Sequence, residues 1–419
     1  MPRCGAVSRK PRPRPNVRSR NRHRSVRKVI CVSRSNVATT SAASPWRPLL
    51  PIYLACLAFG IQVGTSMPLV PLALDQQGVD KWVIGVVGAA WGVGMIATTP
   101  FVPSLVARLG AVPLICGSAV ISATLSVAFA FTEGVPLWFT LTLLQGVVGG
   151  VPWVVSEIWI NLVVDEKRRG RAMAVYATLI AVGMALGPLI LQFVGLYGPR
   201  PFLVAAGIML VVILPLLPAW KSAPPVHLDE NSGMWRVIRA APVAMLAAFA
   251  CGLGEQVAFS FLPIFAVEAN VSAETGALWL SAFVIGNIAL QWPIGWAADE
   301  LDRRSVLAAC ALASAVLVAS IGFIDPQSYG ILGVLVLWGG ISFGIYTVGL
   351  ALLGQHFSGG DIARANAAFT IMYTVAGLVG RPIAGGAMDV MGRSGMTFTV
   401  MFFYALAGVA ALLAMRRRG

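Results

Sequence analysis

Charged side chains are scarce in this sequence. Only 11% of its 419 residues are Asp, Glu, Lys or Arg, whereas soluble domains carry about 25%. Hydrophobic residues make up 57% of the chain, and the mean hydropathy is +0.79. A chain of this length could bury a large water-soluble core, but it has too little polar surface to cover one. The composition therefore excludes an ordinary soluble domain and predicts an integral, multi-pass membrane protein.

Histidine and cysteine are also few. The sequence has 3 histidines and 6 cysteines, with no Cys-x-x-Cys and no Cys/His spacing typical of a metal site. We therefore expect no metal, no cofactor and no disulfide framework. A Gly-rich phosphate-binding loop is missing too, which argues against an ATP-driven pump. Without a cluster of His, Cys or carboxylates, a membrane-embedded enzyme is left as a remote alternative.

The basic charge of the chain is concentrated before residue 49. Residues 1–48 contain 13 Lys and Arg and no Asp or Glu, which accounts for nearly all of the formal net charge of +14. We expect this tail to be disordered, and we expect no nucleic-acid partner. Three interpretations stay open: a cytoplasmic segment lying on anionic lipid, a targeting segment, or a start of translation further along, near Val37.

Long apolar runs dominate the rest of the chain. A helix needs about 20 apolar residues to cross the hydrocarbon core, and backbone in lipid must satisfy its hydrogen bonds internally. Runs of that length predict an all-α protein with twelve transmembrane helices. They are approximately 49–72, 83–104, 112–131, 135–163, 171–194, 201–219, 242–266, 277–297, 305–323, 329–353, 367–388 and 396–415.

Basic residues outside the tail indicate the orientation of these helices. With the N-terminus inside, the inner loops and the C-terminus hold 14 Lys and Arg, against three in the outer loops. Lys and Arg favour the cytoplasmic side of a membrane. We therefore expect both termini in the cytoplasm, and the bacterial inner membrane as the location.

The chain repeats itself at an offset of 193 or 194 residues. Gly60 falls on Gly254, and Gly146 falls on Gly340, each at the same place in a group of six spans. This predicts two pseudo-symmetric six-helix bundles in parallel orientation, an arrangement that recurs in transporters. The expected segments are a tail (1–48), a first bundle (49–219), a cytoplasmic linker (220–241), a second bundle (242–415) and a basic C-terminus (416–419).

A loop motif after the eighth span carries a family resemblance. The run from Gly295 to Arg304 (GWAADELDRR) resembles the motif that the major facilitator superfamily has between helices 2 and 3 and repeats between helices 8 and 9. The first copy, residues 103–111, keeps Arg108 but has Ala107 in place of the acidic residue. The resemblance covers residues 49–415. It implies the fold of that family and a secondary transporter that works by alternating access.

In that family the acidic and basic residues of the motif form a latch at the inner face. The resemblance implies that Asp299, Arg303, Arg304 and Arg108 hold this face closed in one conformational state.

Two charged residues lie at similar depth in predicted spans. Glu255 is about 12 residues into the seventh span and Arg381 is about 14 residues into the eleventh. A charge at mid-bilayer costs several kcal/mol and usually serves a function. Helices 7 and 11 are neighbours in the family, so we expect the two residues to form a buried pair or share a water-filled site, with Glu255 taking up a proton. A static ion pair between the helices is the alternative.

Another carboxylate, Glu157, lies near the inner end of the fourth span, which lines the cavity in that family. We expect it to be a second proton site or a gate. Alternatively, it pairs with the basic residues that follow the span, which are Arg168, Arg169 and Arg171. Asp389 and Glu268, near the outer ends of their spans, are expected to be solvated.

Three mid-span amides, Gln62, Gln145 and Gln256, lie on spans that line the cavity in the family. We expect them to contact polar groups of the substrate. Bridging between helices, worth about 0.6 kcal/mol per bond, is the alternative. Thr142 stands where the helix-4 motif of the family has an arginine.

Together these features predict a transporter of a small organic solute that is coupled to protons and works as a monomer in the lipid bilayer. Gly183, Gly187 and Pro188 resemble part of a motif found in antiporters, which favours export. Proton-linked uptake of a metabolite is the alternative. The few charges at mid-depth favour neutral or weakly charged substrates.

Overall fold

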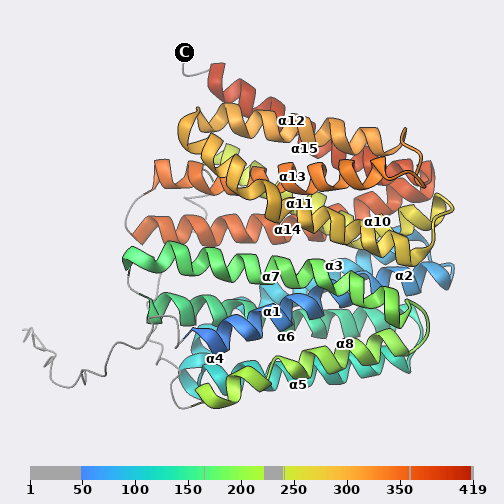
Figure 1. Cartoon of the computed structure of the whole chain (residues 1–419), viewed down its shortest axis with the longest axis vertical. Coiled ribbons are helices and arrows are strands. Elements are labelled where there is room, and N and C mark those ends of the chain that lie inside the picture. Colours follow the sequence, from blue (N-terminus) through green and yellow to red (C-terminus); the bar gives the residue numbers. More distant parts are fainter. Residues whose placement is uncertain (1–48, 165, 221–238, 240, 358–359, 417–419) are drawn as a thin grey trace, which may run out of the picture. The chain divides into compact units, whose positions relative to one another are not determined.

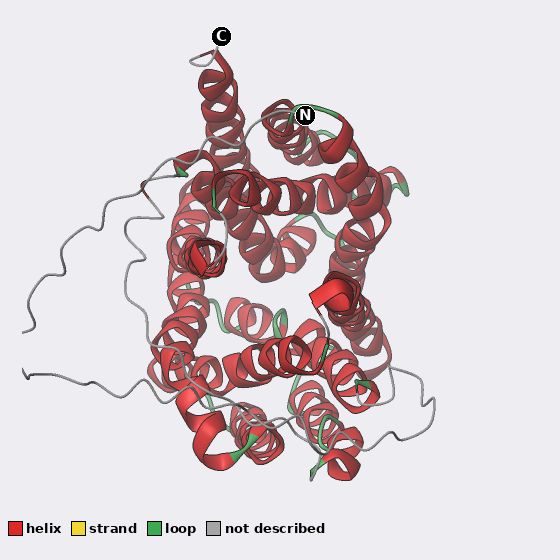
Figure 2. Cartoon of the chain, turned by 90° about the vertical axis from the view of Figure 1, so that its left-hand side faces the viewer, coloured by secondary structure: helices red, strands yellow, loops and turns green. Residues whose placement is uncertain are grey.

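The computed structural model describes residues 49–164, 166–220, 239, 241–357 and 360–416. Every element assigned within them is a helix, as Figure 2 shows. The expectations for the tail (1–48) and for most of the linker (220–241) fall outside the described residues, as do residues 417–419. The elements are α1 (Leu50–Ser66), α2 (Leu69–Gln76), α3 (Lys81–Thr98), η1 (Thr99–Phe101), α4 (Val102–Leu109), α5 (Ala111–Ala130), α6 (Val135–Val163), α7 (Glu166–Val194), α8 (Arg200–Val211), η2 (Leu214–Ala219), α10 (Pro242–Glu268), α11 (Ala273–Glu300), α12 (Arg303–Ile321), α13 (Gly330–His356), α14 (Gly360–Met391) and α15 (Ser394–Arg416).

Within the described residues, 12 helical segments are long and apolar enough to cross a membrane, so the predicted number of spans is confirmed. Three of them are built from consecutive helices: α1 with α2, α3 with η1 and α4, and α8 with η2. Proline lies at each of these junctions, at Pro68, Pro100 and Pro215. Because proline lacks the N–H that an α-helix needs to continue, it interrupts the helix without ending the span.

Several helices extend beyond the predicted spans. The eleventh span, predicted as 367–388, lies inside α14 (Gly360–Met391), and the eighth, predicted as 277–297, lies inside α11 (Ala273–Glu300). The added residues include Asp389, Asp299 and Glu300. Helical hydrogen bonding continues into such polar residues, whereas hydrophobicity marks only the part that crosses the hydrocarbon.

The two halves of the described structure pack in the same way. In the first half α1 packs on α7, α3 on α6, and α5 on α6 and α8; in the second half α10 packs on α14, α11 on α13, and α12 on α13 and α15. Figure 1 shows the helices of the second half stacked above those of the first. Each pair occupies the same position in its six-span group, so the two halves are pseudo-symmetric six-helix bundles, as the repeat predicted.

Two of the repeated glycines have equivalent neighbours. A Cβ on Gly146 of α6 would collide with the backbone of Trp91 in α3. A Cβ on Gly340 of α13 would collide with the carbonyl of Gly286 in α11. Both glycines therefore allow the fourth helix of a half to approach the second closely, which is how small residues act between membrane helices.

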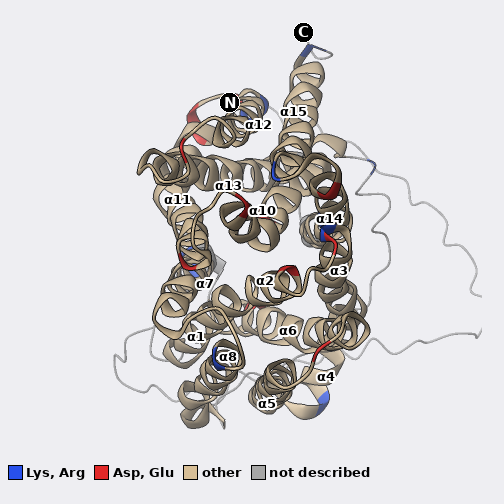
Figure 3. Cartoon of the chain, turned by 90° about the vertical axis from the view of Figure 1, so that its right-hand side faces the viewer, with Lys and Arg blue, Asp and Glu red and all other residues tan. Residues whose placement is uncertain are grey.

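Helix α10 is the most enclosed span: 89% of its apolar window is buried, against 61% or less in every other span. Figure 3 shows it surrounded by other helices, with few charged residues along the helices. A side chain on α10 therefore faces protein rather than lipid. This places the sequence around Glu255 in the interior.

Candidate functional site

A cavity of about 110 Å³ lies between the two halves. Most of its wall comes from α1, α3, α5, α6 and α8, while Ser260 of α10 and Arg381 of α14 close it from the second half. Aromatic side chains line part of it: Phe59, Trp91, Phe129 and Phe202. The first-half residues that contribute polar side chains are Gln62, Ser66, Ser122, Ser126, Thr142 and Gln145.

Arg381 points inward and connects three helices. It is only 4% exposed, and it donates hydrogen bonds to the carbonyl of Gly88 in α3 and to both the carbonyl and the side-chain oxygen of Gln256 in α10. The guanidinium thus links α14 to α3 across the two halves. Gln256, predicted to contact the substrate, acts here as the acceptor that holds Arg381.

Glu255 lies next to this connection and is 7% exposed. Its Oε2 atom is buried and has no hydrogen-bond partner among the described residues. The ion pairs that the described side chains form do not include one between Glu255 and Arg381, because Arg381 donates to Gly88 and Gln256 instead. The direct pair that the sequence suggested is therefore not the arrangement in this state, although both charges are buried in the same region.

The other two predicted amides line the cavity itself. Gln62 donates to Ser66 within α1, with an N–O distance of 3.0 Å. Gln145 of α6 accepts from Ser122 Oγ at 2.8 Å and donates to Ser126 Oγ at 3.1 Å, so it also bridges α6 to α5. Gln145 therefore has the bridging role that the sequence left open, and its position on the cavity wall keeps substrate contact as a prediction.

Glu157 is half-buried on α6 and does not line the cavity. Its Oε1 atom accepts from the indole nitrogen of Trp153 at 2.9 Å. The ion pairs of the described side chains do not join it to Arg168 or Arg171, and the side chain of Arg169 is outside the described part. Pairing with those two arginines is therefore not its role in this state.

The four predicted latch residues, at the end of α4, the end of α11 and the start of α12, do not all contact one another. Arg303 lies 3.6 Å from Asp299, whose side chain is 75% exposed, and donates to the carbonyl of Ala351 at 2.7 Å. Arg304 donates to the carbonyl of Ala414 at 2.8 Å. Arg108 is exposed in the last turn of α4. In this state the two second-half arginines donate to carbonyls near the C-terminal ends of α13 and α15, where the helix dipole favours a cation.

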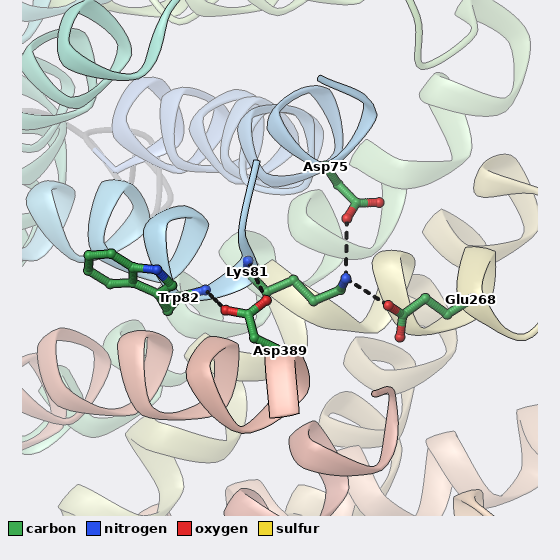
Figure 4. Close-up of polar contacts among 5 residues, drawn as sticks. All are labelled: Asp75, Lys81, Trp82, Glu268 and Asp389. Atoms are coloured by element: carbon green, nitrogen blue, oxygen red, sulfur yellow. Dashed lines mark hydrogen bonds and ion pairs between the residues drawn. The ribbon is translucent and has the colours of Figure 1, made fainter. Parts of the chain in front are cut away.

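At the opposite end of the bundle, a polar cluster joins the two halves (Figure 4). Lys81 Nζ lies 2.8 Å from Glu268 and 3.9 Å from Asp75. Asp389 of α14 accepts from the backbone N–H of Lys81 at 2.8 Å and from that of Trp82 at 2.9 Å. Asp389 and Glu268 are both exposed, as expected, but each also bonds to residues of the other half. We call these residues, Asp75, Lys81, Trp82, Glu268 and Asp389, the Lys81 cluster.

The cap that Asp389 provides has no signal in the sequence. Asp80 occupies the N-cap position of α3 but makes no side-chain capping bond. The first amides of α3 are instead satisfied by a carboxylate more than 300 residues away along the chain. An N-cap preference concerns local sequence, so it does not reveal a cap supplied by another helix.

Contact between α3 and α14 runs from the Lys81 cluster to Arg381. A Cβ on Gly385 would collide with the carbonyl of Lys81, and a Cβ on Gly85 would collide with the backbone of Arg381 and Pro382. On the other side of the bundle, Ser281 of α11 donates to the carbonyl of Ala185 in α7 at 2.8 Å. These contacts all lie nearer the Lys81 end, so the two halves are joined at this end.

Comparison with known proteins gives a consistent match. The family model of the Major Facilitator Superfamily matches residues 52–268 and 244–418. The uncharacterized MFS-type transporter YfkF of Bacillus subtilis is 25% identical over 335 residues, which is 78% of this chain and 85% of the relative. The uncharacterized MFS-type transporter YcaD of Escherichia coli is 25% identical over 339 residues, covering 80% of this chain and 87% of that protein.

Solved structures share the fold. A variant of the nucleoside transporter NupG aligns with a TM-score of 0.73 and 16% identity, covering 88% of this chain and 99% of that one. A bacterial homologue of the human lysosomal transporter Spinster, in an inward-facing and unoccupied conformation, aligns with a TM-score of 0.70 and 15% identity over 89% of this chain and 98% of that one.

Proposed function

Because the chain belongs to the Major Facilitator Superfamily, and is thus a membrane transporter rather than an enzyme, we propose that it exports a small organic solute in exchange for protons. The observation that carries this proposal is a cavity between the halves with a buried, unpartnered carboxylate oxygen on the neighbouring helix α10. The cavity offers a solute site, and Glu255 offers a proton site. Glu157 is proposed as a second proton site or a gate.

We propose that the Lys81 end faces the outside. The bias of Lys and Arg toward the loops at the other end supports cytoplasmic termini, and the relatives named above are bacterial, which supports the inner membrane. We also propose that the protein works as a monomer, because one chain supplies residues of both halves to the cavity wall. The segment 220–241 is proposed as the linker that lets the halves rock against each other.

In this mechanism the protonation of Glu255 and the position of Arg381 are coupled. A buried carboxylate oxygen without a hydrogen-bond partner is better accommodated protonated than ionised. Parting α3 from α14 removes the Gly88 carbonyl from Arg381 and frees a donor for Glu255. Pairing with the arginine then favours the carboxylate, so the protonation of Glu255 and the contact between α3 and α14 are linked.

A transport assay with an imposed pH gradient tests this function. The protein is reconstituted in vesicles, and a panel of drugs and metabolites is followed with the proton gradient applied in either direction. We expect solute to move in the direction opposite to the flow of protons. Movement of solute together with protons would instead support uptake, and indifference to the gradient in both directions would contradict proton coupling.

Removing the carboxylate of Asp389 is expected to open the Lys81 end. Asp389→Ala deletes two hydrogen bonds from backbone amides to a charged group, each worth about 1.5–3 kcal/mol. In a variant with its native cysteines replaced and Ser260→Cys introduced in the cavity wall, we expect an impermeant thiol reagent on the Lys81 side to react about tenfold faster or more.

Asp325→Ala is the matched control for this experiment. Asp325 follows α12, at the same end of the bundle, and its carboxylate accepts only from Gln327 of its own loop among the described residues. It should leave the reaction rate unchanged. If the thiol reacts equally fast in Asp389→Ala and in the protein that keeps Asp389, this cap does not hold the halves together.

A further inference from the structure

We infer that the cavity takes an organic anion with an apolar or aromatic body, which Arg381 binds through its free N–H groups. This inference rests on the proposed function for the site, but it concerns what binds rather than what drives transport. It also revises the expectation of neutral or weakly charged substrates.

The charge of the cavity wall is the first step. Arg381 is the only charged side chain among the described residues that line the cavity, and no carboxylate is among them. Glu255 is buried beside the wall rather than in it. Thr142, which stands where the helix-4 motif of the family has an arginine, is on the wall. The wall therefore carries one positive charge, and a low-dielectric cavity with charge of one sign attracts the opposite sign.

The hydrogen-bonding capacity of Arg381 is the second step. A guanidinium has five N–H donors. Nε donates to the Gln256 carbonyl, Nη1 to the Gly88 carbonyl and Nη2 to the Gln256 side chain. One N–H on each terminal nitrogen is left. Two such donors fit a carboxylate, which takes parallel bonds from Arg and gains both strength and geometric selectivity.

An unsatisfied hydroxyl is a second, independent sign of a ligand. Thr142 lines the cavity and is 7% exposed, yet its Oγ1 atom has no hydrogen-bond partner among the described residues. The nearby Ser122 and Ser126 are already bonded to Gln145. A buried hydroxyl without a partner is costly unless something else satisfies it. Thr142 is therefore positioned to bond a polar group of the solute.

The rest of the wall favours an apolar body. Phe129 and Phe202 are stacked with their ring centroids 5.8 Å apart, and Trp91 and Phe59 also line the cavity. Aromatic walls bury flat or aliphatic bodies well, and a few polar groups then fix their orientation. The cavity thus combines one anion-binding donor pair, one hydroxyl and a largely aromatic surface.

Binding of matched compounds to the purified full chain tests this assignment. The compounds form three sets, one with a phenyl body, one with an indole body and one with an octyl body. Each set contains a carboxylate, the corresponding amide and the corresponding amine. Quenching of tryptophan fluorescence, to which Trp91 in the wall contributes, gives the dissociation constants. A neutral detergent keeps anionic lipid from competing. We expect at least one carboxylate to bind about tenfold or more tightly than its amide and its amine.

Variants assign the effect to the site. Arg381→Gln should remove the preference for the carboxylate, and Arg200→Gln, which changes an exposed arginine at the start of α8, should not. Thr142→Val keeps the shape of the side chain but removes its hydroxyl. It should weaken binding of a 4-hydroxyphenyl carboxylate and leave that of the unsubstituted phenyl carboxylate unchanged, which tests the site even if Arg381→Gln does not fold.

Two outcomes overturn the inference: amides or amines that bind as tightly as the carboxylates, or failure of every carboxylate to bind. Neither outcome depends on a proton gradient, because binding is measured in detergent. Failure of the proposed exchange with protons would appear only in vesicles. The two proposals can therefore fail separately.

Discussion

Glu255→Gln is expected to abolish transport driven by a pH gradient while leaving exchange of solute between the two sides of a vesicle intact. Glutamine has nearly the same shape and fills the same buried position on α10, but it cannot take up or release a proton. The proposed cycle couples the protonation of Glu255 to the contact between α3 and α14. Without that proton the cavity can still alternate, but the gradient no longer biases it.

The measurement compares solute flux in vesicles with and without an imposed pH gradient. Glu300→Gln is the control, because Glu300 is an exposed carboxylate at the end of α11. It should retain the response to the gradient. Full gradient-driven transport by Glu255→Gln would remove Glu255 as the proton carrier and leave Glu157 as the candidate to test next.

Gly85→Leu is expected to reduce transport to background. A Cβ at this position would collide with the backbone of Arg381 and Pro382, which cannot move without shifting α14. A leucine therefore keeps α3 and α14 apart and prevents the Lys81 end from closing. A transporter that cannot close one end cannot complete its cycle, so the loss should be large even though no charged or polar group is changed.

Flux and thiol reactivity at Ser260→Cys measure this effect together: flux should fall and reactivity from the Lys81 side should rise. Gly117→Leu is the matched control, because Gly117 is an exposed glycine within α5 and a Cβ there would meet nothing within 4 Å. Normal flux by Gly85→Leu would mean that close contact between α3 and α14 is not required for the cycle.

The fold follows from the sequence because the bilayer imposes simple rules. Length and hydrophobicity gave the twelve spans, and the repeat of Gly146 at Gly340 gave the pseudo-symmetry, since both depend on residues within one segment or at a fixed offset. Burial of Glu255 and Arg381 was also predictable, because charges in apolar spans avoid lipid. That Gln62 and Gln145 line the cavity followed from their depth within spans that line the cavity in the family.

The partners of these residues were not predictable. Whether Arg381 bonds Glu255 or the Gly88 carbonyl depends on how α14 lies against α3, a distance that no local pattern encodes. The same holds for Asp389, whose partners are backbone amides of a helix in the other half. Backbone groups look alike in every sequence, so contacts to them leave no trace in residue types. In the sequence, Thr142 was notable only because the family motif has an arginine there. That its hydroxyl lacks a hydrogen-bond partner depends on how the helices pack.

The cap that Asp389 supplies to α3 affects the energy needed to change between the two conformational states. When α14 withdraws, the amides of Lys81 and Trp82 lose a charged acceptor, which solvent replaces only in part. Asp80, the N-cap residue of α3, makes no capping bond while Asp389 is present and is placed to accept from the Trp82 amide once Asp389 has left. Replacement of Asp389 by Asp80 as the acceptor would therefore offset part of the loss and lower the barrier between the two conformational states.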